Sequence, residues 1–410
     1  MTQSQQGKEL SLFSFPVLVA ALGYFVDIYD LLLFSIVRVE SLQSLGLSDV
    51  LIRDEGMDII GHQMTGLMIG GILWGMMGDK KGRLSVLFGS ILLYSLANIA
   101  NGFVTNVTQY SWTRFIAGIG LAGELGAGIT LVSELLSREK RGVATSLVAG
   151  IGLFGAVMAY FIAQWFDWRT CYFIGGGLGL CLLLLRVRVF ESGMFHKLKD
   201  KNVSKGNFIM FFTKASRFKK YLLSILIGLP TWYVVGILIS FSKEFGKEFG
   251  MMDPINPGKA VMFTYTGIAL GDVAAGLLSQ WLRSRKKALY IFYVLTAIGI
   301  FLYFQQYNGT ATGMYLISFY LGIATGFWAI FVTMAAEQFG TNLRATAATT
   351  VPNMVRGSLP LISMLFIYLQ GFMSYVQAAA WTGIVVMAVS VISAVFTEET
   401  FGRDLNFIEE

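Results

Sequence analysis

The chain has 410 residues, of which 55% are hydrophobic and only 14% are charged, and its formal net charge is +6. Soluble domains carry about a quarter charged residues, so this composition argues against a soluble enzyme and for an integral membrane protein. The positive charge does not require a nucleic-acid partner, because basic residues that flank membrane helices give the same total. We therefore expect the lipid bilayer, and no nucleic acid, as the surroundings of the chain.

Twelve apolar segments are each long enough to cross a bilayer as a helix, which needs about 20 residues. In chain order they are 12–37, 57–78, 84–103, 109–137, 142–165, 170–190, 219–242, 258–282, 288–306, 311–338, 345–370 and 375–397. The sequence therefore predicts an all-α membrane protein with an N-terminal six-helix bundle in 1–190 and a C-terminal six-helix bundle in 219–397. A cytoplasmic linker at 191–218 and a cytoplasmic tail at 398–410 complete the predicted division.

Basic residues are distributed unevenly between the two sides of the predicted membrane. With the N-terminus in the cytoplasm, 23 Lys and Arg fall on the cytoplasmic side and 6 on the other. Because Lys and Arg concentrate in cytoplasmic loops, this distribution predicts an even number of spans and two cytoplasmic termini. We expect a multi-pass protein of the inner membrane.

Two pairs of stretches about 200 residues apart match each other. TGLMIGGILWGMMG at 65–78 shares three aligned glycines with TGIALGDVAAGLLS at 266–279, and SELLSREKRGVAT at 133–145 matches AEQFGTNLRATAA at 336–348 in a Glu and an Arg. Repeated halves are typical of secondary transporters. The sequence therefore predicts two pseudo-symmetric bundles.

Several motifs resemble those of the major facilitator superfamily. GMMGDKKGR at 75–83 is similar to its signature loop, RFIAGIG at 114–120 to its fourth-helix motif, and ETFGR at 399–403 to its half-terminating motif. FVDIYDLLLF in the first span and GLAGELGAGITLVSE in the fourth look closest to metabolite:proton symporters and organic-ion transporters. The resemblance covers essentially the whole chain, and it implies proton-coupled transport by alternating access.

Four charged residues lie inside the first and fourth spans, with Asp27, Asp30 and Glu124 near mid-membrane depth and Arg114 in the outer third. A charge at the bilayer centre costs at least ~2.5–3.5 kcal/mol. The positions of these residues along the helices allow Arg114 to meet Asp30, and Glu124 to approach Asp27. An Asp held ionised by an Arg takes up a proton once the Arg moves away in an apolar cavity. These four are the predicted proton-coupling residues; the alternative is a structural ion pair between the two helices.

The second half departs from the repeat at two charged positions. Asp272 and Arg356 correspond to uncharged residues of the first half, which suggests substrate contact, and Pro352 predicts a helix break beside Arg356. For Arg356, a salt bridge to Asp272 is the alternative; for the aromatic candidates, it is simple packing. The predicted substrate-binding residues are Tyr29, Arg38, Trp232, Tyr233, Asp272, Trp328, Asn353 and Arg356.

A further set of charges lies at the cytoplasmic ends of the spans. We expect these residues to form ion pairs between the bundles that close the cytoplasmic side. The predicted gate consists of Asp79, Arg83, Glu134, Arg141, Arg285, Glu337 and Arg344.

Arg binds carboxylates with two parallel hydrogen bonds, so basic residues near the membrane centre favour an organic anion. We expect a secondary active transporter, working as a monomer, for a small carboxylate-bearing metabolite and protons. A zwitterion or organic cation as substrate, proton-driven export and a non-transporting sensor stay open. The chain has only two His and no Walker loop, so we expect no enzyme, catalytic residue, metal or cofactor.

Overall fold

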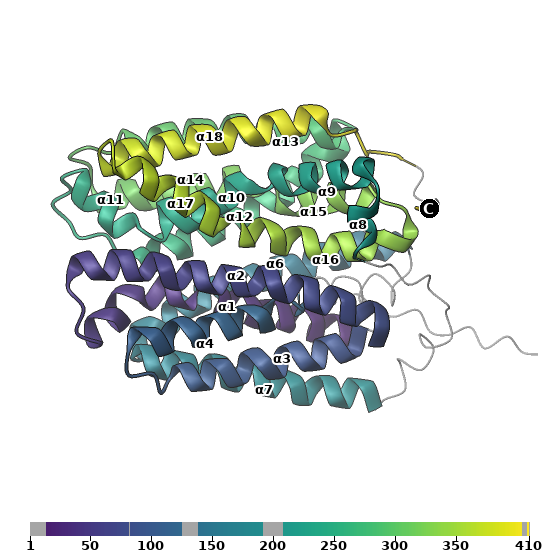
Figure 1. Ribbon diagram of the computed structural model, residues 1–410, viewed down its shortest axis with the longest axis horizontal. Helices are drawn as coiled ribbons and strands as arrows, with labels where there is room; N and C mark the ends of the chain where they lie inside the picture. The colour runs from purple at the N-terminus through teal and green to yellow at the C-terminus, as the bar shows by residue number, and fades with distance from the viewer. Residues whose placement is uncertain (1–13, 82, 125–137, 192–207, 404–407, 410) are drawn as a thin grey trace, which may run out of the picture.

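The computed structural model describes residues 14–81, 83–124, 138–191, 208–403 and 408–409. Within these residues the chain forms helices and no strand. Eight helices, some counted across a break, are long and apolar enough to cross a membrane, judged by length and composition. Most of the helices run along the long axis of the molecule, with α1 to α4 and α7 in the lower part of Figure 1 and α9 to α18 in the upper part.

The helices of the first half match the six spans predicted there. The fourth predicted span, 109–137, is described only as far as Glu124. The helices are α1 (Phe15–Ser44), α2 (Asp49–Lys81), α3 (Arg83–Asn101), α4 (Val107–Leu121), α6 (Arg138–Trp165) and α7 (Trp168–Glu191).

The second half also follows the six predicted spans, but three of them are broken into shorter helices. The elements are α8 (Met210–Thr213), α9 (Ala215–Ile227), α10 (Leu229–Tyr233), the π-helix η2 (Val234–Ile239), α11 (Ser242–Glu248), α12 (Pro257–Trp281), α13 (Arg285–Phe304), α14 (Ala311–Thr325), α15 (Trp328–Glu337), α16 (Thr341–Gly357), α17 (Leu359–Gln370) and α18 (Tyr375–Phe396).

Proline and glycine account for the breaks. Gly228 and Pro230 separate α9 from α10, and Ser358 and Pro360 separate α16 from α17. Proline lacks the N–H that continues a helix and fits its first turn, so each proline starts a new segment. The predicted break at Pro352 is wrong, because Pro352 lies inside α16, which continues to Gly357.

The internal repeat appears as two helix crossings with the same glycine contacts. A Cβ atom on Gly70 of α2 would overlap the backbone oxygen of Ile119 on α4. A Cβ atom on Gly271 of α12 would overlap the backbone oxygen of Ile323 on α14. Small residues let membrane helices approach closely. The shared contacts confirm the prediction of two pseudo-symmetric bundles.

We predict that Gly271→Ala lowers stability, because the new methyl group pushes α12 and α14 apart, at a cost of about 1–3 kcal/mol. Gly276→Ala on the same helix is the matched control, since nothing lies within 4 Å of its Cβ position. Thermal melting of both purified variants in detergent measures the effect. Equal melting temperatures for Gly271→Ala and the control would contradict the role of the close crossing.

Candidate functional site

Arg356, near the end of α16, is buried where the two bundles meet. Its side chain is 2% exposed, and its Nε and Nη1 atoms have no hydrogen-bond partner among the described residues. The guanidinium carbon lies 5.9 Å from the ring centre of Trp232 and 5.8 Å from that of Trp328. Such distances allow cation–π attraction to both indoles. Arg356 therefore presents a cation between two aromatic faces.

Helix α1 of the first half supplies an acid and a phenol to the same region. The charge of Arg356 acts on Asp27 and Tyr24 of α1 and on Tyr265 of α12. Asp27 is fully buried, and neither of its carboxylate oxygens has a hydrogen-bond partner among the described residues. The interface thus holds an acid and a base within electrostatic reach of each other, with no hydrogen bond between them.

The broken helices of the second half position Trp232, Trp328 and Arg356. These three residues, together with Asp27, Tyr24 and Tyr265, are called the central site below. Trp232 lies in α10, Trp328 is the first residue of α15, and Arg356 is the second-last residue of α16. Carriers bind substrate near the midplane, where helices are interrupted. Three of the eight side chains predicted for substrate binding, those of Trp232, Trp328 and Arg356, meet at such interruptions.

Asp272 has a part that was not predicted for it. Its Oδ1 atom accepts a hydrogen bond from the backbone N–H of Ala329 at 2.9 Å, which is the usual place for an acid at a helix N-terminus. Within the described residues, the structure shows no ion pair between Asp272 and Arg356, and contact of Asp272 with a substrate stays a prediction. Asp272 fixes the start of α15 and so positions Trp328.

Three predicted substrate-binding residues form hydrogen bonds between helices and do not surround Arg356. The hydroxyl of Tyr29 donates to the backbone oxygen of Cys171 at 2.9 Å, and that of Tyr233 to Ala379 at 2.7 Å. The amide of Asn353 donates to the backbone oxygen of Ala122 at 2.9 Å, which joins α16 to the end of α4. For Tyr29 and Tyr233 these hydrogen bonds agree with the packing alternative, and contact of all three residues with a substrate stays a prediction.

Arg38 lies outside the central site and pairs with Glu244 of α11. Helix α11 lies at the end of the bundles opposite the C terminus, which we call the far side (left in Figure 1). Arg38 Nη1 is 2.8 Å from Glu244 Oε1, and the Arg38 guanidinium lies 4.4 Å from the ring centre of Phe241. Because Arg38 belongs to α1 and Glu244 to α11, this pair joins the two halves. Arg38 therefore joins the two halves at the far side in this structure, and its contact with a substrate stays a prediction.

A second ion pair joins the halves at the far side, in a more exposed position. Lys247 Nζ lies 2.6 Å from Asp49 Oδ2, and Lys243 Nζ lies 3.7 Å from Asp49 Oδ1. The hydrogen bond from Lys247 holds the pKa of the Asp49 carboxyl below its ordinary value. Any stabilisation by this pair is therefore present at neutral pH and is lost as acid protonates Asp49.

Asp30 and Arg114 are neighbours, as predicted, but form no direct ion pair. Both carboxylate oxygens of Asp30 lack a hydrogen-bond partner among the described residues, although the charge of Arg114 acts on this group. Arg114 donates instead to the side-chain oxygens of Asn98 and of Asn101, the latter at 3.3 Å. Its guanidinium also lies 4.6 Å from the ring centre of Tyr172.

Glu124 is bound to Arg186 of α7, a basic residue near the end of the sixth predicted span. Arg186 Nη1 donates to Glu124 Oε2 at 2.9 Å, and Nη2 donates to Oε1. Arg186 is 7% exposed, and a Cβ atom on Gly23 of α1 would overlap the pair. Glu124 therefore acts on Asp27 only through its charge, and within the described residues the two side chains form no hydrogen bond with each other. The sequence does not single out Arg186 as the partner of Glu124, because Arg186 lies among other basic residues.

Tyr94 of α3 was missed by the sequence analysis. Its hydroxyl is buried without a hydrogen-bond partner among the described residues, and the charges of Glu124 and Asp30 act on it. A buried polar atom left unpaired costs about 1–3 kcal/mol, so a group of them indicates function. The first bundle holds such a group, with atoms that lack a partner within the described part of the chain on Asp27, Asp30, Tyr94, Ser95, Asn98, Asn101 and Arg114.

The predicted cytoplasmic gate is described only in the second half. Arg285 Nη2 lies 3.4 Å from Glu337 Oε1, and the charge of Glu337 acts on Arg344. The Thr400 hydroxyl also donates to Glu337 at 2.6 Å. The Arg285–Glu337 pair lies within one bundle, so it is not the expected bond between bundles. The other predicted members lie, in whole or in their side chains, outside the described residues: Asp79, Arg83, Glu134 and Arg141.

Two repeated helical bundles with charged residues at their interface define a secondary carrier. The family model described as "Major Facilitator Superfamily" matches residues 20–358. The chain belongs to this superfamily, which confirms the resemblance drawn from its motifs. It is a multi-pass membrane transporter.

The chain is similar to several curated transporters. It is 26% identical to the niacin transporter NiaP of Acinetobacter baylyi, over 95% of each chain. It is 29% identical to the 3-(3-hydroxy-phenyl)propionate transporter of Escherichia coli, over 81% of this chain and 83% of the relative. It is 25% identical to the gentisate transporter of Corynebacterium glutamicum, over 81% and 75% respectively.

The fold resembles a solved structure of the inward-open xylose transporter XylE from E. coli. The TM-score is 0.71 at 18% identity, over 96% of this chain and 98% of that chain. This likeness confirms the twelve-helix architecture of two six-helix bundles.

We predict that Arg186→Met destabilises the protein by about 3–5 kcal/mol, because it leaves the buried Glu124 charge unpaired. Adding Glu124→Gln should recover part of the loss, since the charge is then removed. Thermal melting of both single variants and the double variant measures the coupling. The exposed Arg53–Asp54 pair is the control, with an expected coupling below about 1 kcal/mol. Additive effects at Glu124 and Arg186 would contradict a direct pair.

We predict that Glu244→Gln opens the far side, because Arg38 is buried and loses its charged partner, at a cost of about 3–5 kcal/mol. The readout is labelling of a cysteine at Ser35, next to the closure, by a membrane-impermeant maleimide in a Cys171→Ala, Cys181→Ala background. Labelling should accelerate at least about tenfold. Asp54→Asn is the control and should leave the rate unchanged. An unchanged rate in Glu244→Gln would exclude this closure.

Proposed function

We propose that the protein carries a small aromatic carboxylate across the inner membrane by symport with protons. The observation that supports this most strongly is Arg356, a buried guanidinium between Trp232 and Trp328 whose Nε and Nη1 have no hydrogen-bond partner among the residues that the structure describes. The names of the three relatives above denote aromatic carboxylic acids. The carboxylate of such a substrate corresponds to the guanidinium of Arg356, and its ring corresponds to the indoles of Trp232 and Trp328.

The carboxylate is the part of the substrate that Arg356 would bind. A buried cation without a partner is costly, and a carboxylate relieves this cost with two parallel, charge-assisted hydrogen bonds. The planar guanidinium suits this geometry better than the ammonium of a lysine. An aromatic ring attached to the carboxylate would pack against Trp232 or Trp328.

Proton coupling would arise because Asp27 and the substrate compete for the same cation. Ionised Asp27 is attracted to Arg356, whose charge acts on it. A proton on Asp27 removes this attraction and leaves Arg356 to the substrate carboxylate. Proton and anion therefore favour each other's binding, which is the condition for symport. Asp30 beside Arg114 would provide a second proton site in the same bundle.

A zwitterionic substrate is the second candidate, because Asp27 offers an acceptor for an ammonium group across from Arg356. Direct competition between an aromatic acid and the corresponding amino acid separates the two. A protonated Asp27 disfavours the zwitterion, so the symport mechanism above supports the simple anion.

We also propose the membrane arrangement drawn from the sequence, with both termini in the cytoplasm and a monomeric carrier. Residues 1–190 and 219–397 would be the two domains, joined by 191–218. Asp79, Arg83, Glu134 and Arg141 would close the cytoplasmic side from the first half.

We predict that Arg356→Gln abolishes uptake of nicotinate or gentisate into proteoliposomes, because the substrate charge loses its partner. Arg356→Lys keeps the charge but loses the paired geometry, so the apparent affinity should fall about tenfold to a hundredfold. Arg53→Gln, on the exposed surface, is the control. Equal competition by an acid and by its uncharged amide would contradict recognition of a carboxylate.

We predict that Asp27→Asn uncouples transport from protons, since the variant is permanently neutral at this position. Accumulation driven by a pH gradient should be lost, whereas exchange of labelled for unlabelled substrate without a gradient should continue. Asp54→Asn is the control and should keep both activities. Full gradient-driven accumulation in Asp27→Asn would show that another residue carries the coupled proton.

A further inference from the structure

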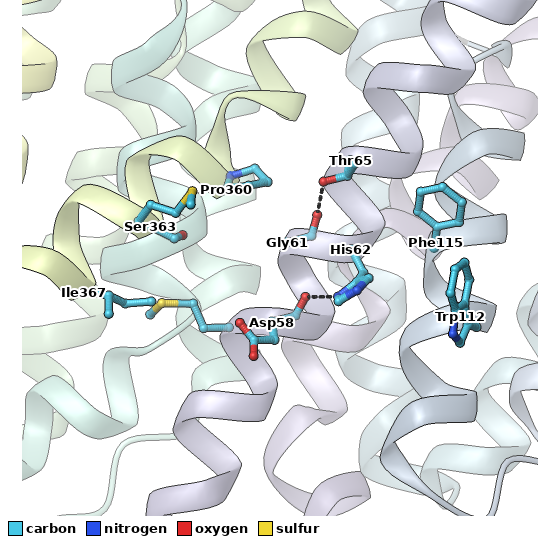
Figure 2. Close-up of a pocket in the computed structure, with 11 residues that line it drawn as sticks. Asp58, Gly61, His62, Thr65, Trp112, Phe115, Pro360, Ser363 and Ile367 are labelled. Atoms are coloured by element: carbon cyan, nitrogen blue, oxygen red, sulfur yellow. Dashed lines mark hydrogen bonds between the residues drawn. The ribbon is translucent and has the colours of Figure 1, made fainter.

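A groove with a volume of about 330 Å³ lies between the two halves on the outer face of the bundles (Figure 2). Helix α2 of the first half lies in the middle, between α4 of the same half on one side and α17 of the second half on the other (Figure 2). The groove opens outwards, because Trp112, Met364 and Ile367 at its walls are 59%, 65% and 51% exposed. It is separate from the central site, none of whose residues line it.

The sequence of α2 places this groove at the edge of the hydrocarbon layer. Asp58 is the last charged residue before Asp79, and the 20 residues between them, 59–78, carry no charge. Twenty helical residues span about 30 Å, the thickness of the hydrocarbon core. Asp58 therefore lies at the far-side boundary of the bilayer, and His62 lies one turn deeper. Trp112 across the groove is an aromatic residue of the kind that gathers at this boundary.

Two side chains of α2 at this boundary, His62 and Asp58, offer hydrogen-bond acceptors. His62 Nδ1 lies 2.8 Å from the backbone oxygen of Asp58. A carbonyl oxygen only accepts, so Nδ1 carries the hydrogen and Nε2 of the neutral ring is an acceptor. The exposed Asp58 carboxylate is a second acceptor, with negative charge. The Thr65 hydroxyl already donates to Gly61 at 2.8 Å, and the groove is lined by no Lys or Arg among the described residues.

The ligand that fits has a positive charge, several N–H donors and an apolar chain. The donors match Asp58 and His62, and the chain matches the apolar side chains of Phe115, Met364 and Ile367 along the walls. In a bilayer, a phospholipid with a primary ammonium headgroup combines these properties at this depth. A quaternary ammonium headgroup carries the same charge but has no N–H to donate.

We propose that the groove binds a phospholipid with a primary ammonium headgroup from the far-side leaflet, with its ammonium donating to Asp58 and His62. Such a lipid touches α2 and α4 of one half and α17 of the other. Alternating access moves the halves relative to each other, so this site is complete in only part of the cycle. The lipid then favours the conformation in which the groove is intact.

Native mass spectrometry of the full chain in detergent tests the proposal without reference to substrate or protons. The probes are phosphatidylethanolamine, its N,N-dimethyl derivative and phosphatidylcholine, all with the same acyl chains. The wild type should retain phosphatidylethanolamine about tenfold more than phosphatidylcholine, with the dimethyl lipid between them. Asp58→Asn should abolish the preference, and His62→Phe should reduce it. Asp54→Asn, an exposed acid on the same helix that pairs with Arg53, should leave it unchanged.

Three outcomes would overturn the proposal. The first is equal retention of the three lipids by the wild type, and the second is an unchanged preference in Asp58→Asn with a wild-type melting temperature. The third is displacement of the lipid by free ethanolamine at similar concentration, which would assign the groove to a small cation. A dimer that Asp58→Asn dissociates would assign it to a second copy of the chain and would equally exclude the lipid.

Discussion

A charge inside a bilayer persists only where protein, water or ligand surrounds it, and this constraint organises the interior of the transporter. Glu124 and Arg186 meet it by binding each other, and Arg38 meets it by binding Glu244 across the halves. Arg356 and Asp27 meet it only in part, since polar atoms of both side chains have no hydrogen-bond partner in the described part of the chain. The satisfied charges hold the helices together, whereas the unsatisfied ones lie where a substrate and a proton would bind.

The two halves share a scaffold but differ in chemistry. The same glycine contacts build the α2–α4 and α12–α14 crossings, so the framework follows from duplication. The first half gathers buried acids and unpartnered polar atoms among unbroken stretches of α1 and α3. The second half carries the broken helices that present Trp232, Trp328 and Arg356. Proton handling and substrate binding would thus belong to opposite sides of one interface, and Asp27 and Arg356 connect them.

The number and order of the spans were predictable from the sequence, because apolar length and the placement of Lys and Arg are strong signals in a membrane protein. Arg356 was predictable as well, since it breaks the internal repeat. The partners of the buried charged residues were not predictable from the sequence. Arg186 lies at the end of an apolar span, in a run of basic residues that looks like a cytoplasmic loop. Pro352 looked like a helix break, although the chain breaks six residues later at Ser358, because the packing of neighbouring helices decides where a proline interrupts a membrane helix.

The π-helix η2 connects the central site to the far side. It lies directly between Trp232 and Tyr233 of α10 and the segment that carries Glu244. A π-helix closes each turn with an i→i+5 hydrogen bond, one residue more than an α-helix, and often occurs at functional sites. Conversion of η2 to α-helical geometry would shift the register by one residue and rotate α11 relative to Trp232. A change beside the substrate would then rotate the end of the seventh span, and with it Glu244, the partner of Arg38 at the far side.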